Sequence, residues 1–171
     1  YLTQWTMDDV ESVGLLKIDF LGIRYLTMVS NIVDQIKKDN PSFDITKINY
    51  ADQKVYNLFT QGRTEGIFQF ESSGMKEKLR LLRPTEFNDI VAMNALYRPG
   101  PMAQIETYVR RKHGEEKVVY PHPHLEKILR DTYGVIVYQE QIMLIAVNFA
   151  HMSLNEADNM RRAVSKKKKE D

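Results

Sequence analysis

The sequence contains no cysteine. Disulfide bonds and thiolate metal sites, zinc fingers included, are therefore excluded. No apolar run approaches the roughly 18 residues of a membrane-spanning helix, so we expect no membrane association. Neither a P-loop nor a dinucleotide-binding G-x-G-x-x-G motif occurs, and a nucleotide site of either type is not supported.

An excess of one charge sign is also missing, because 24 Lys and Arg stand against 23 Asp and Glu. The formal net charge of +1 argues neither for nor against a nucleic-acid partner. The distribution is uneven, however, since six basic residues lie between Arg161 and Lys169 with no acidic residue among them. Such a run is typical of a segment that contacts phosphates, but a solvated helix end or a frayed tail has the same pattern.

The rest of the composition is that of an ordinary globular protein, with 43% apolar and 27% charged residues. A chain of 171 residues can bury a core without a disulfide or a metal. It begins at Tyr1 instead of Met, has no signal peptide and stops within the charge run. We therefore expect a cytoplasmic, monomeric segment of a longer polypeptide.

Hydrophobic spacing predicts a mainly α-helical chain with one short strand at its start. Apolar and polar residues alternate from Leu15 to Leu21, which predicts a strand after a polar loop over residues 8–14. From Ile23 the spacing changes to three and four residues and predicts a helix to Lys38. Ser72 or Ser73 is predicted to cap a helix that contains Met75, Leu79 and Leu82 and ends at Pro84, and Thr85 to cap another that runs toward Leu96. Further helices are predicted over residues 52–60, 102–113, 124–131 and 138–151, and from a capping box at Ser153 to Glu156 onward.

The pattern leaves one segment ambiguous, and it also indicates how the chain is divided into domains. Residues 67–70 fit either a strand or a buried turn. The single strand at residues 15–21 cannot satisfy its own backbone groups, so its sheet must lie elsewhere. We therefore predict that residues 1–22 are the edge of an incomplete domain and that residues 23–171 form a multi-helix domain.

Lys17 and Asp19 are the first candidates for chemistry, because they lie two residues apart on one face of the predicted strand. A carboxylate there can bind Mg²⁺, and the lysine can bind a phosphate on the same metal. On spacing alone, a surface ion pair is the more frequent explanation. Two histidines, His122 and His124, lie around Pro123, but without cysteine and with a single nearby carboxylate they are a poor zinc site.

Arg161 and Arg162 are the second pair of candidates. Adjacent guanidinium groups can grip a triphosphate or a nucleic-acid backbone with forked donors, while the alternative is a basic helix end in solvent. At the start of a predicted helix, Tyr138 and Gln139 are able to stack on bases or hydrogen-bond to them, although capping and packing are commoner roles for such residues.

A series of short motifs runs through the chain in a fixed order. They are KIDFLG at residues 17–22, FQFES at 68–72, GM at 74–75, RPGP at 98–101, RKHG at 111–114, YGVIVYQEQ at 133–141, and AD at 157–158 leading to RRA at 161–163. This series resembles the motifs of the bacterial C-family replicative DNA polymerases, the DNA polymerase III alpha subunits. It covers residues 17–163, nearly the whole chain.

The resemblance implies a fold and a set of site residues. The strand would belong to an incomplete nucleotidyltransferase-like palm, and residues 23–171 to the fingers domain. Asp19 matches a catalytic, metal-binding aspartate of the family, and Lys17 matches a lysine that contacts the incoming triphosphate. Arg161 and Arg162 match an arginine pair that faces the phosphates. The further candidates for DNA or nucleotide contacts are Arg98, Tyr138, Gln139, Lys166 and Lys167.

The resemblance also implies a reaction and its partners. The complete enzyme would carry out template-directed DNA synthesis by two-metal phosphoryl transfer, with Mg²⁺ as its cofactor. Primer-template DNA and a dNTP would be its substrates, and other replicase subunits such as the sliding clamp its partners.

The chain departs from the family pattern in two ways. Phe70 replaces the usual leucine, and the aspartate pair that lies upstream in the family is missing. Because a two-metal site needs several carboxylates, we expect this segment by itself to bind Mg²⁺ weakly and to be inactive. The alternatives are a non-catalytic helical module that binds nucleic acid with steep salt dependence, and a helical protein-interaction scaffold that binds none.

Overall fold

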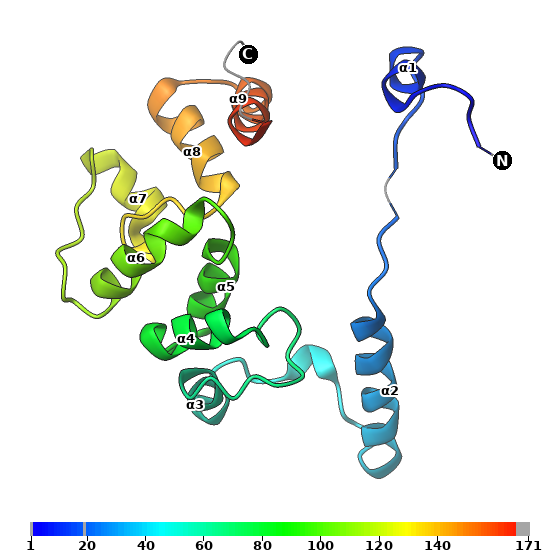
Figure 1. Cartoon of the computed structure of the whole chain (residues 1–171), viewed down its shortest axis with the longest axis vertical. Helices are drawn as coiled ribbons and strands as arrows, with labels where there is room; N and C mark the ends of the chain where they lie inside the picture. The colour runs from blue at the N-terminus through cyan, green and yellow to red at the C-terminus, as the bar shows by residue number, and fades with distance from the viewer. Residues whose placement is uncertain (1, 19, 167–171) are drawn as a thin grey trace. The chain divides into compact units, whose positions relative to one another are not determined.

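The computed structural model describes residues 2–18 and 20–166 of the chain. These residues form nine α-helices and four short 3-10 helices, and no β-strand occurs among them (Figure 1). The mainly helical fold class predicted from the sequence is confirmed. Two compact units divide the chain, Tyr1–Ile48 and Asn49–Asp171, and each is described by itself.

The first unit contains α1 (Met7–Ser12), α2 (Arg24–Asp39) and a 3-10 helix at Ile45–Lys47. The loop predicted over residues 8–14 is wrong for most of that segment, because Thr6 caps a short helix there. Its hydroxyl accepts the Asp9 backbone N–H at 3.3 Å, and two aspartates in the first turn complement the helix dipole. The helix predicted as far as Lys38 is confirmed by α2.

The predicted strand is not formed by the described part of its segment, residues 15–18 and 20–21. A strand requires a neighbour that takes up its N–H and C=O groups and a core against which one face can pack. Of the residues described in the first unit, none is buried, and even Leu26 and Val29 of α2 are exposed. The first unit therefore offers the segment neither a partner strand nor a core.

The second unit carries the other helices (Figure 1). They are α3 (Gln53–Thr60), α4 (Ser73–Leu82), α5 (Phe87–Leu96), α6 (Ile105–Lys112), α7 (Glu126–Leu129), α8 (Gln139–Ala150) and α9 (Leu154–Lys166), with 3-10 helices at Pro101–Gln104, Pro123–Leu125 and Arg130–Thr132. Among all the described helices, none is long and apolar enough to cross a membrane.

Two helices are shorter than the hydrophobic spacing predicts. The α-helical part of the segment predicted over residues 102–113 begins only at Ile105, after a 3-10 turn that Gly100 enters with a φ of 103°. A residue with a side chain rarely adopts that backbone conformation, so glycine is required at this turn. The helix predicted over residues 124–131 is reduced to the four residues of α7, which depend on burial of Leu129 because so short a helix is unstable alone.

Side chains at the helix starts confirm one predicted cap and correct another. The Ser72 hydroxyl accepts the Met75 backbone N–H at 3.3 Å, as expected for the cap of α4. Thr85 was expected to cap the next helix, but it does not. Instead Asp89 Oδ2 accepts the backbone N–H groups of Thr85 and Glu86, at 2.8 and 3.2 Å. The Asp89 carboxylate, inside the first turn of α5, therefore takes the capping role that was predicted for the Thr85 hydroxyl.

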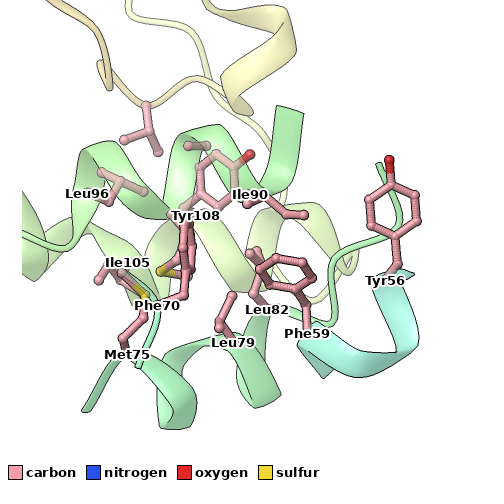
Figure 2. Close-up of a cluster of buried hydrophobic side chains, with 13 residues drawn as sticks. Tyr56, Phe59, Phe70, Met75, Leu79, Leu82, Ile90, Leu96, Ile105 and Tyr108 are labelled. Atoms are coloured by element: carbon pink, nitrogen blue, oxygen red, sulfur yellow. The ribbon is translucent and has the colours of Figure 1, made fainter. Parts of the chain in front are cut away.

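The hydrophobic core of the second unit lies between α3, α4, α5 and α6 (Figure 2). Its fully buried side chains include Leu79 and Leu82 of α4, Leu96 of α5, and Ile105 and Tyr108 of α6. These positions repeat at spacings of three and four along each helix, which is why the sequence pattern identified the helices. The same core supports the loop between α5 and α6, which borders the candidate site.

The segment over residues 67–70 is a turn and not a strand, and of its four residues only Phe70 is buried. The Phe70 N–H donates to the Ile67 carbonyl at 3.0 Å, and the Thr64 hydroxyl donates to the Phe70 carbonyl. Phe70 packs edge-to-face on Phe59, with ring centroids 5.5 Å apart. The turn is therefore anchored to the core through Phe70.

The capping box predicted at the start of α9 is confirmed. Glu156 accepts the Ser153 backbone N–H at 2.8 Å, and Ser153 Oγ accepts the Glu156 N–H at 3.3 Å. The hydrogen bond from the Ser153 side chain, followed by that from its backbone, lowers the pKa of the Glu156 carboxyl. The box sets where α9 begins and hence where its basic residues fall.

The pKa of Glu156, measured by NMR titration of its carboxyl carbon, is expected to lie below its ordinary value of 4.5. Since a lowered pKa favours the folded state above the unfolded-state value, the cap contributes fully above about pH 4.5 and is lost as the pH falls through the folded pKa. Ser153→Ala should move the pKa back toward the ordinary value. A pKa that this substitution leaves unchanged would contradict the capping box.

Candidate functional site

Arg161 and Arg162 are both held by one carboxylate on their own helix. Asp158 Oδ1 accepts from Arg161 Nε and Nη2, at 2.9 and 2.8 Å, and Asp158 Oδ2 accepts from Arg162 Nη2 at 2.8 Å. The spacings of three and four residues place all three side chains on one face of α9. The arginine pair is therefore oriented before any ligand arrives, with Arg162 the more exposed at 62% of its side chain.

A second helix joins this arrangement. The α8 and α9 helices lie side by side (Figure 1), and Arg161 Nη1 donates to Gln139 Oε1 at 2.9 Å. Gln139 is the first residue of α8, so the first turn of one helix is tied to the basic face of the other. The structure thereby brings together three of the residues that the sequence singled out, although 22 positions separate Gln139 from Arg161.

A cavity of about 940 Å³ lies beside these residues. One wall is formed by Ala95 of α5, Arg98 and the turn after it. The other residues that line the cavity are Val137, Tyr138, Gln139, the acidic Glu140, and Val164 of α9. The volume falls in the range of pockets that hold a nucleotide-sized ligand, and apolar walls with a few charged and aromatic groups are typical of such pockets. Arg98, Tyr138 and Gln139 are thus brought to one cavity by loops that follow α5 and precede α8.

The electrostatics of this site favour an anion near α9. The hydrogen bond from Arg161 is the main reason that the pKa of Asp158 is lowered, so its carboxylate stays ionised and the three charged groups together carry one net positive charge. Burial, followed by the charges of Asp131 and Asp89, raises the pKa of Tyr138, which keeps its phenol neutral. A neutral ring beside a guanidinium can stack on a base without repelling the phosphates attached to it.

Comparison with known proteins gives consistent matches along the chain. Residues 25–171 match the model of the bacterial DNA polymerase III alpha subunit finger domain. The chain belongs to this family. It is 58% identical to a DNA polymerase III subunit alpha of Staphylococcus aureus (strain COL) over 167 residues, and 57% identical to one of Bacillus subtilis (strain 168) over 171 residues.

These matches cover 97% and 99% of the chain, but 16% and 15% of the two relatives. The chain thus spans about one sixth of the length of the curated relatives it matches, and it corresponds to their finger region. The resemblance inferred from the motifs is confirmed at the level of the family. The boundary expected between residues 22 and 23 stays a prediction.

Four of the residues predicted as site residues are not placed in this arrangement. Lys17 is an exposed residue of the first unit, whereas Arg161 and Arg162 belong to the second. Asp19 and Lys167 lie outside the residues that the structure describes, and Lys166 is the last residue of α9. The predicted roles of Asp19 in metal binding, of Lys17 in triphosphate binding, and of Lys166 and Lys167 in DNA or nucleotide contacts stay predictions.

No group of three or more His, Asp or Glu side chains within the described residues is placed to hold a metal ion. A Mg²⁺ site that includes Asp19 stays a proposal. His122 and His124 have a role in local structure. The His122 Nδ1 atom accepts the His124 backbone N–H at 3.2 Å, and the His122 ring packs on Phe149.

Sequence reasoning missed two residues of this site. Asp158 was recognised only as part of a motif, although its spacing of three and four residues from the arginines could have revealed its role. Gln141 is singled out in the sequence only as the last residue of the motif at residues 133–141, and nothing near it predicts the four hydrogen bonds that it makes. Its partners include residues as distant in the chain as Ile128 of α7, which only the fold brings close to it.

Proposed function

We propose that, in a polypeptide of the length of its relatives, this chain takes part in template-directed DNA synthesis and binds the triphosphate of the incoming dNTP. The observation that carries the proposal is the oriented pair of Arg161 and Arg162, which Asp158 and Gln139 hold beside a cavity of about 940 Å³. The family of the chain supports it, since the relatives are named as subunits of a DNA polymerase.

The arginines are suited to this task because a guanidinium has five N–H donors in a planar fork. Asp158 and Gln139 occupy three nitrogens of Arg161, and Asp158 occupies one nitrogen of Arg162, so N–H donors of both residues remain for phosphate oxygens. Because Asp158 holds the forks in place, little side-chain entropy is lost when the phosphates bind. Tyr138 and Arg98 line the space in which a base attached to that triphosphate would lie.

The other components of the proposal come from the family motifs. Asp19 is proposed to share Mg²⁺ with carboxylates outside this chain, and Lys17 to contact the same triphosphate. Bound Mg²⁺ supplies positive charge that activates the primer hydroxyl and offsets the charge of the leaving pyrophosphate. The proposed substrates are primer-template DNA and a dNTP, and the proposed partners are other replicase subunits such as the sliding clamp. This role places the complete polypeptide in the cytoplasm.

Residues 1–22 are proposed as the edge of the palm, and residues 23–171 as part of the fingers. Lys166 and Lys167 follow Arg161 and Arg162 in the sequence and are proposed to contact DNA phosphates. Contacts of this kind are independent of base sequence, as a polymerase requires.

Arg161→Ala in the full-length polypeptide is expected to raise the apparent dNTP Kd by about 10- to 100-fold, because hydrogen bonds from a charged donor to a phosphate are lost. The measurement is the dNTP concentration dependence of single-turnover incorporation on a primed template. The matched control is Arg130→Ala, which removes an exposed guanidinium that pairs with a carboxylate one turn away, Glu126, outside the site.

The control should leave incorporation unchanged, and DNA affinity should change less than twofold in both variants. An unchanged dNTP Kd for Arg161→Ala, together with weaker and less salt-dependent DNA binding, would contradict triphosphate binding. That result would favour a helical module that binds nucleic acid without taking part in catalysis.

A further inference from the structure

Gln141 is a buried polar residue that uses its whole hydrogen-bonding capacity. It is 6% exposed, in the first turn of α8. Its Oε1 accepts the backbone N–H groups of Val137 and Tyr138, at 2.8 and 3.0 Å. Its Nε2 donates to the Ile128 carbonyl at 3.2 Å and to Thr132 Oγ1 at 2.8 Å. A glutamine amide offers two acceptor and two donor positions, so all four are satisfied.

The partners of Gln141 leave only one orientation for its amide. Two backbone N–H groups must meet an acceptor, and the Ile128 carbonyl must meet a donor, so the amide cannot be turned over. The Thr132 hydroxyl, itself buried, donates onward to the Val135 carbonyl at 2.6 Å. The backbone of residues 137 and 138 is therefore tied through one side chain to the turn that follows α7.

This tie acts on residues of the candidate site. Tyr138 lines the cavity beside Arg98, and the next residue, Gln139, accepts from Arg161 Nη1 at 2.9 Å. A shift of the backbone at residue 138 would move the Tyr138 ring and the Gln139 amide together. Displacements of about 1 Å in a group that orients a reactant can cost up to about a hundredfold in rate.

We propose that Gln141 is a positioning residue for the triphosphate site: it fixes the backbone at Tyr138 and, through Gln139, the direction of the Arg161 guanidinium. The proposal rests on the proposed function of Arg161. Gln141 itself is buried and is not among the residues that line the cavity.

The test uses the full-length polypeptide and a double-mutant cycle. Gln141→Met, which keeps the length of the side chain and removes all four hydrogen bonds, is expected to raise the apparent dNTP Kd about tenfold. In a Gln139→Ala background the same substitution should add less than about twofold, because the connection to Arg161 is already cut. The readout is again the dNTP dependence of single-turnover incorporation.

A purely structural role is distinguished by a matched control elsewhere in the core. Thr64→Val removes the buried hydroxyl that donates to the Phe70 carbonyl, and it should lower thermal stability without moving the dNTP Kd. If Gln141→Met does not fold, Thr132→Val serves in its place, because it removes one partner of the Gln141 amide. It is expected to raise the dNTP Kd about two- to fourfold. In a Gln139→Ala background it should have no further effect on the dNTP Kd.

Some negative results would contradict the positioning role alone, and another would contradict the proposed function. If Arg161→Ala raises the dNTP Kd but neither Gln141→Met nor Thr132→Val does, the positioning role is wrong and the proposed function stands. The positioning role would also be wrong if the effects of Gln141→Met and Gln139→Ala on the dNTP Kd simply add, since independent sites show no coupling. If Arg161→Ala has no effect, the proposed function fails first.

Discussion

Replacing Asp89 with alanine is expected to lower the free energy of unfolding by about 3–5 kcal/mol, because it leaves a buried lysine without its counter-charge. Asp89 is fully buried, and its Oδ2 lies 3.0 Å from Lys112 Nζ, whose side chain is only 8% exposed. The same oxygen accepts the N–H groups of Thr85 and Glu86 at the start of α5. One substitution therefore removes an ion pair and a helix cap together.

The loss is measured by urea unfolding of the 171-residue chain, followed by far-UV circular dichroism. Glu65→Ala is the matched control, since Glu65 pairs with Lys76 at 2.7 Å but its side chain is 74% exposed. Water screens that pair, so its removal should cost far less. Adding Lys112→Met to Asp89→Ala should recover part of the stability, because the uncompensated charge is then gone.

An Asp89→Ala variant as stable as the Glu65→Ala control would contradict this account. Asp89 Oδ1 has no hydrogen-bond partner among the described residues, which lowers the net value of the pair. The prediction thus concerns the free energy lost when one partner of the Asp89–Lys112 pair is removed. It does not compare the intact pair with two apolar residues in its place.

Asp19→Asn in the full-length polypeptide is expected to lower single-turnover dNTP incorporation by at least about 1,000-fold with Mg²⁺ present. The substitution keeps the size of the side chain and removes the negative charge that a metal ligand needs. Asp19 lies outside the described residues, and the prediction depends on the family motif at residues 17–22. DNA binding should remain intact, because a single metal ligand contributes little to duplex affinity.

The matched control is Asp34→Asn, which removes an exposed carboxylate from α2 in the same unit. It is expected to leave incorporation within about twofold of the unchanged protein, as is usual for an exposed surface residue. Near-normal incorporation by Asp19→Asn would mean that its carboxylate is structural. The assignment of the segment to a metal site would then have to be withdrawn.

The helices of the second unit show how far local pattern reaches. The spacing of Leu79 and Leu82, with Ser72 before them, predicted α4 almost to the residue, because caps and amphipathic faces depend on neighbours within one or two turns. The same reasoning failed for residues 8–14, where polar composition obscured a cap at Thr6. It also failed for residues 15–21, because a strand depends on partners and not on its own alternation.

The candidate site divides in the same way. Arg161 and Arg162 were predicted from their adjacency and from family motifs, and their grip on Asp158 follows from the spacing within one helix. The hydrogen bond of Arg161 to Gln139 could not be predicted, since it joins two helices whose packing no local pattern encodes.

By itself, the sequence determined the family, the mainly helical class and most helix boundaries, because these depend on motifs and on contacts between residues near one another in the chain. Only the tertiary structure decided that Asp89 pairs with Lys112, that Gln141 ties Tyr138 to Thr132, and that one cavity collects residues from three helices and two loops. The physical reason is that a buried polar group takes whichever partner the folded core presents to it, and burial is a property of the whole fold.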